Sequence, residues 1–124
     1  MDESFFQQIG GHEFFVQLVD GFYEGIEQDE VLRPMYPDDL TDSKHHLVMF
    51  LEQYWGGPRT YQAERGHPRL RMRHAPFPID DDARDRWIAH MHESLSRIDV
   101  PKQFRDELWT YLVSAAHSLV NKIS

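Results

Sequence analysis

The chain has 124 residues, which fits one domain, and its 40% hydrophobic and 13% aromatic residues suffice for a single core. The formal net charge of −8 disfavours general nucleic-acid binding, because a phosphate backbone repels an acidic protein. The absence of cysteine excludes disulfides, iron–sulfur clusters, thiolate zinc sites and c-type haem attachment.

The first predicted element is a helix over 13–28, preceded by a turn at Gly10-Gly11. Its apolar residues recur at helical spacing: Phe15, Val16, Val19, Phe22, Tyr23 and Ile26. Pro34 and Pro37 bracket the two residues between them, which predicts a turn or a short 3₁₀ segment there.

A second helix follows, with Thr41 or Asp42 as its N-cap, and the Gly-Gly-Pro sequence at 56–58 ends it. One stripe along this helix contains Ser43, Leu47, Phe50, Leu51 and Tyr54. Residues 56–70 have no clear period and predict a long ordered loop, a feature that is usually functional in a compact domain. A short helical turn over 70–74 ends before Pro76.

Asp80 predicts the N-cap of another helix, whose buried face comprises Trp87, Met91, Leu95 and Ile98. Pro101 suits the first turn of a final helix. Its apolar residues are Phe104, Leu108, Leu112, Ala115, Leu119 and Ile123. The pattern therefore predicts an all-α single domain over 1–124 with four main helices and no strands.

The histidines do not predict a helical metal site. No two of the eight lie three or four residues apart, H-E-x-x-H is absent, and His90 and His92 point to different faces of their helix. A site assembled from distant histidines stays open.

Arginines gather in the predicted loop, between Pro58 and His74. They are Arg59, Arg65, Arg69, Arg71 and Arg73. A solvated loop that pairs with acidic helices is one interpretation. The other is an anion site, because arginine donates bidentate hydrogen bonds to carboxylate or phosphate. A haem propionate, a nucleotide phosphate or RNA would satisfy it, although no Gly-rich phosphate loop is present.

Tyr23 lies on the apolar face of its helix, so its hydroxyl needs a hydrogen-bond partner. Tyr36 and Trp87 are candidates for the same buried, donor-bearing set. Ordinary core packing is the alternative for each of these aromatic residues. From the residues alone, the chain is an all-α domain with an arginine loop and candidate donors for a pocket.

Four segments resemble the group II (O-type) truncated haemoglobins. They are Phe22-Tyr23, Met35-Tyr36-Pro37, the FLEQYWGGP sequence at 50–58 and the RGHPRLRMRH sequence at 65–74. The resemblance covers nearly the whole chain. It implies a truncated globin fold, a two-over-two helical sandwich that holds haem b.

The resemblance also implies residue roles. His74 matches the proximal iron ligand, and Tyr23, Tyr36 and Trp87 match the distal residues that stabilise the ligand. Ser43 falls at the distal position of the second helix, and Leu47 and Phe50 follow it along the cavity. The candidates to hold the haem propionates are Arg71, Arg73, Tyr54, Tyr61 and His46.

The implied function is binding of O₂ and other diatomic ligands with slow release, serving redox, peroxide or nitric oxide chemistry with an unidentified reductase. Simple O₂ storage or transport is the alternative, and a cofactor-free module that binds an acidic partner is the alternative from another class. We expect a cytoplasmic protein with no signal peptide and no membrane span. A homo-oligomer is left open.

Overall fold

The computed structural model describes residues 5–55 and 79–118, without the side chains of Phe5, Tyr54 and Ser118. All regular structure in this part of the chain is helical, as predicted. The elements are α1 (Phe5–Ile9), α2 (Gly11–Glu27), the 3₁₀ helix η1 (Arg33–Met35), α3 (Thr41–Tyr54), α6 (Asp81–Ser96) and α7 (Lys102–Ser118).

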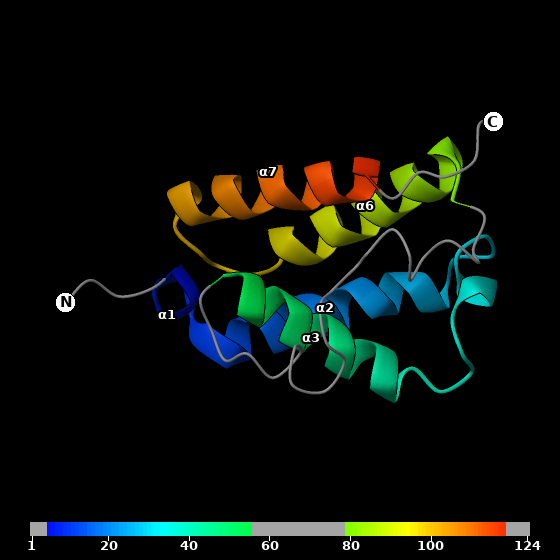
Figure 1. The fold of residues 1–124 in the computed structure, drawn as a ribbon, viewed down its shortest axis with the longest axis horizontal. Coiled ribbons are helices and arrows are strands. Elements are labelled where there is room, and N and C mark those ends of the chain that lie inside the picture. Colours follow the sequence, from blue (N-terminus) through cyan, green and yellow to red (C-terminus); the bar gives the residue numbers. More distant parts are fainter. Residues whose placement is uncertain (1–4, 56–78, 119–124) are drawn as a thin grey trace.

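These helices form two layers, with α6 and α7 lying over α2 and α3 (Figure 1). Helix α2 packs against α6 and α3, and α6 packs against α7. The predicted two-over-two sandwich is therefore confirmed for the described helices. Helix α1, which packs against α2, was not predicted because five residues are too few for a visible period.

Helix α2 supplies much of the core. Phe15, Leu18, Val19, Phe22 and Ile26 are all 0% exposed. The helix begins two residues before the predicted start because two glycines make the turn into it. Their φ angles of 125° and 67° lie in the left-handed region that favours glycine.

The predicted N-cap of α3 is wrong. Thr41 is already helical, and Leu40 precedes it without a side-chain cap. Asp39 provides the local bond instead, because its Oδ1 accepts from the N–H of Thr41 at 2.9 Å. The predicted 3₁₀ segment is confirmed, although η1 spans Arg33–Met35 and so begins one residue before Pro34.

The remaining helix starts follow the sequence closely. Oδ1 of Asp80 accepts from the N–H of Ala83 at 2.9 Å, which confirms the predicted cap of α6. The predicted buried face holds for Met91 and Leu95, whereas Trp87 and Ile98 are half-buried. Pro101 directly precedes α7 rather than lying within its first turn.

Helices α2 and α6 cross closely at two glycines. A Cβ on Gly21 would lie 2.3 Å from Oγ of Ser94, and a Cβ on Gly25 would lie 2.4 Å from Nδ1 of His90. Ser94 is buried, and its Oγ donates to the carbonyl of Leu18 at 2.6 Å. Both glycines therefore make room for α6 residues four positions apart.

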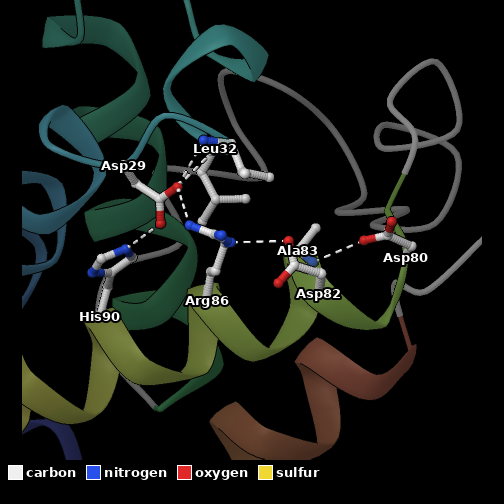
Figure 2. Close-up of polar contacts among 8 residues, drawn as sticks. Asp29, Leu32, Asp80, Asp82, Ala83, Arg86 and His90 are labelled. Atoms are coloured by element: carbon white, nitrogen blue, oxygen red, sulfur yellow. Dashed lines mark hydrogen bonds and ion pairs between the residues drawn. The ribbon is translucent and has the colours of Figure 1, made fainter. Parts of the chain in front are cut away.

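A buried carboxylate joins the same two layers just beyond the end of α2 (Figure 2). Asp29 Oδ2 lies 2.7 Å from Nε2 of His90, and its Oδ1 accepts from Nη1 of Arg86 at 3.2 Å. The same Oδ1 accepts from the backbone N–H groups of Val31 at 2.9 Å and Leu32 at 3.0 Å. Asp29 is 7% exposed, so its charge depends on these donors.

These contacts set the pKa of Asp29. Burial alone would raise it, but the hydrogen bonds from His90, Leu32 and Val31, and the charge of Arg86, lower the pKa to about 2. Because the folded-state pKa is depressed, the stabilisation is present above the unfolded value near 3.8 and is lost as pH falls towards 2.

Gly21→Ala tests the close helix crossing. Overpacking costs about 1–3 kcal/mol, while replacing a helical glycine gains at most about 1 kcal/mol, so we expect a net loss of stability on the order of 1 kcal/mol. Urea denaturation measures it. Gln17→Ala, on the exposed side of the same helix, is the control and stays within about 0.5 kcal/mol of the parent. A more stable Gly21→Ala variant would contradict the close contact.

Asp29→Asn tests the buried carboxylate. The depressed pKa corresponds to roughly 2 kcal/mol of stability at neutral pH, which this variant removes. We expect the unfolding free energy of the parent to fall between about pH 4 and about pH 2, and that of the variant to fall less. Asp106→Asn, which changes an exposed carboxylate, is the control. Parallel curves for parent and Asp29→Asn would show that the carboxylate contributes nothing.

Candidate functional site

Two of the predicted donors lie together between α2 and the segment after η1. The rings of Tyr23 and Tyr36 meet edge to face, with centroids 5.5 Å apart. Tyr23 is 3% exposed, and its side chain is hydrogen-bonded to that of Ser43 on α3. The predicted burial of Tyr23 and its need for a partner are confirmed.

Trp87 on α6 joins this pair through Phe22. The Phe22 ring lies 5.1 Å from that of Tyr23 and 5.3 Å from the Trp87 ring system, both at steep angles. Trp87 and Tyr36 are half-buried and pack against the core. Four aromatic side chains therefore form a continuous cluster, and three of them carry an O–H or N–H donor.

The environment keeps both tyrosines in their neutral, donating form. Burial raises the pKa of Tyr23 far above its ordinary value near 10, the nearby Tyr36 raises it further, and the hydrogen bond with Ser43 opposes them. Burial raises the pKa of Tyr36 to about 12. Neither phenol loses its proton at physiological pH, so both keep an O–H to donate.

Helix α3 supplies the remaining described candidates. Ser43, His46, Leu47 and Phe50 are all half-buried, at helical spacing that puts them on one side of α3. Leu47 and Phe50 pack against the core. The side chain of Tyr54 lies outside the described part, although its backbone ends α3.

The predicted iron ligand and the arginine loop lie outside the described residues. This holds for Tyr61, Arg71, Arg73 and His74. Their roles stay predictions.

No group of three or more metal-ligating side chains occurs within residues 5–55 and 79–118. His90 and His92 face apart, as predicted. The former contacts Asp29, and the latter ring lies 5.2 Å from that of Trp109 on α7. In the same part of the chain, no helix combines the length and apolar character that a membrane crossing needs.

Two buried carboxylates were not predicted from the sequence. Asp29 is one, and Glu52 on α3, which is 4% exposed and pairs with His12 on α2, is the other. The position of Asp29 directly after a helix, two and three residues before its backbone donors, is the one local signal. The pairing of Glu52 with a residue 40 positions away has no local signal.

Comparison with known proteins assigns this chain to a family. The model of the bacterial-like globin family matches residues 4–121. The group 2 truncated haemoglobin YjbI of Bacillus subtilis is 39% identical over 112 residues, which are 90% of this chain and 85% of that protein.

Solved structures agree. A thermostable haemoglobin from Thermobifida fusca superposes with a TM-score of 0.94 at 49% identity, covering 96% of this chain and 98% of that one. A truncated oxygen-avid haemoglobin from Bacillus subtilis superposes with a TM-score of 0.91 at 38% identity, covering 96% of this chain and 100% of that one. The chain therefore belongs to the bacterial-like globin family, among the group II truncated haemoglobins, whose cofactor is haem b.

Proposed function

We propose that this globin binds O₂ and other diatomic ligands on haem b with slow release, in the service of redox chemistry or the removal of nitric oxide or peroxide. The observation that carries the proposal is the aromatic cluster in which Tyr23 contacts Tyr36 directly and Trp87 through Phe22, so that three donor-bearing side chains from three elements belong to one packed group. The oxygen-avid character of the Bacillus subtilis relative supports it.

The chemistry of the described residues fits haem. A flat apolar group needs apolar side chains that are packed but not fully covered, and Trp87, Leu47 and Phe50 are of this kind. We assign His74 to the iron, and Ser43 with His46, beside these apolar residues, to the cofactor-binding wall. Tyr54, Tyr61, Arg71 and Arg73 are assigned to the propionates. When bound, haem supplies an iron that takes diatomic ligands and exchanges electrons.

The chain's own residues then determine how long a ligand stays. A diatomic ligand with partial negative charge accepts hydrogen bonds from the Tyr23 and Tyr36 hydroxyls and the Trp87 indole. Each bond stabilises it by about 0.5–1.5 kcal/mol, and more where water is excluded. The hydrogen bond with Ser43 lowers the pKa of Tyr23, as a bond donated to the phenol oxygen does, so the Tyr23 O–H stays available to a ligand.

Slow release separates the proposal from O₂ storage or transport, which requires fast release. The cofactor-free module is not retained, because the family carries haem. A reductase partner, a homo-oligomer, a single domain over 1–124 and a cytoplasmic location stay predictions. Each detoxification reaction needs an electron source, so the reductase belongs to the proposal rather than to its support.

His74→Ala tests the assignment of the iron ligand. We expect the protein expressed in haem-replete cells to show a Soret absorption band, and His74→Ala to lose or loosen the haem because the iron loses its protein ligand. His117→Ala, on the exposed surface of α7, is the matched control and keeps the band. A folded, colourless protein that takes up no added haemin would refute the assignment.

Substitutions of Tyr23 and Trp87 test their role as hydrogen-bond donors to the ligand. We expect Tyr23→Phe and Trp87→Phe each to raise the O₂ dissociation rate of the reduced protein by about 3- to 10-fold, because each removes one hydrogen bond to the ligand. Stopped-flow mixing measures the rate. Trp109→Phe, which changes a tryptophan against His92 on the α7 side, is the control and leaves it unchanged. Fast release in the parent, insensitive to both substitutions, would exclude slow release through these donors.

A further inference from the structure

We propose that Asp29 is a positioning residue for Tyr36, because its carboxylate joins the segment that carries this donor to the turn of α6 that carries Trp87. The inference rests on the proposed function of the donors. It adds a residue that contacts neither ligand nor haem in the assignment above, and that acts through the backbone and through α6.

The contacts on one side of Asp29 hold the segment that leads to Tyr36. Besides the two backbone bonds to its Oδ1, the Asp29 carbonyl accepts from the N–H of Arg33 at 2.9 Å. The Arg33 carbonyl accepts in turn from the N–H of Tyr36 at 3.1 Å. A short chain of bonds therefore runs from Asp29 to the backbone of the donor: its carboxylate holds the start of the segment, and its carbonyl continues the chain to Arg33.

The Arg33 side chain fixes the far side of the same segment. Its guanidinium donates to the carbonyl oxygens of Tyr36 at 3.3 Å, Pro37 at 2.9 Å and Asp38 at 2.9 Å. These bonds hold three consecutive peptide groups against Arg33, whose backbone N–H is in turn bound by the Asp29 carbonyl. The backbone at Tyr36 is thus restrained from both sides. It can therefore move only together with the rest of the segment.

The contacts on the other side of Asp29 reach α6 around Trp87. Arg86 directly precedes Trp87 in the sequence, and His90 follows it by three residues, less than one turn. Both donate towards Asp29, and Arg86 also binds Asp82 at 2.9 Å, which holds the guanidinium along the helix (Figure 2). The Asp29 carboxylate therefore connects the Tyr36 segment to the α6 turn that carries Trp87.

The other buried carboxylate provides a matched control. Glu52 also pairs with a histidine, His12, but it joins α2 to α3 near the N-terminal end of α2. The hydrogen bond of its carboxylate runs to α2 rather than to the Tyr36 segment or to α6. Asp29→Ala and Glu52→Ala each remove a buried carboxylate bonded to histidine, so both are expected to lower the melting temperature.

The two variants should differ in what they do to ligand binding. We expect Asp29→Ala to raise the O₂ dissociation rate by about 3- to 10-fold, the loss of one hydrogen bond, and Glu52→Ala to change it by less than about 2-fold. With carbon monoxide as the probe, infrared spectra of the reduced haem protein should show a shifted or broadened C–O stretching band in Asp29→Ala and in Tyr36→Phe, but not in Glu52→Ala.

A double-mutant cycle decides whether Asp29 acts through Tyr36. We expect Asp29→Ala to have no further effect on the rate in the Tyr36→Phe background. An additive effect there, or an unchanged rate and band in Asp29→Ala alone, would overturn the positioning role while the donor proposal stands. If Tyr36→Phe itself changes neither rate nor band, the donor role of Tyr36 fails and the inference fails with it.

Arg86→Met keeps the proposal testable if Asp29→Ala does not fold. It removes one donor to Asp29 while retaining an apolar stem of similar length, at a side chain that is 41% exposed. We expect a smaller rise in the dissociation rate that disappears in the Tyr36→Phe background. A rate equal to that of the parent in a folded Arg86→Met protein would count against the tie through α6.

Discussion

The rest of the described structure depends on how closely α2 and α6 cross. Gly21 and Gly25 have no side chain to hold the helices apart, so Ser94 and His90 lie directly against the α2 backbone. This approach brings Phe22 into ring contact with Trp87, and it places His90 within reach of Asp29. A wider crossing would separate the donor on α6 from the two tyrosines.

Much of this architecture could be predicted from the sequence, because helical periodicity and local capping are local properties. The helical spacing of α2 predicted its apolar face, which is buried except for the half-buried Val16, and the cap at Asp80 was located to the residue. The cap of α3 was missed because Asp39, two residues upstream of Thr41, satisfies the backbone in place of the expected residue. Local chemistry offered more than one solution there, and the structure adopts the one at Asp39.

The candidate site was likewise predicted only in part. The residue types already made Tyr23, Tyr36 and Trp87 candidates for one donor set, the family resemblance added their distal role, and the structure places them in one aromatic cluster. The polar support could not be predicted in this way. Asp29 meets Arg86 and His90 across 57 and 61 residues, and a carboxylate in an acidic chain gives no sign of such long-range pairing.

The buried phenols have a consequence for where such a protein can work. A phenol that keeps its proton throughout the physiological pH range can donate a hydrogen bond equally well in an acidified and in an alkaline cell. In the role proposed for them, Tyr23 and Tyr36 therefore suit ligand binding that does not vary with pH rather than the sensing of proton concentration.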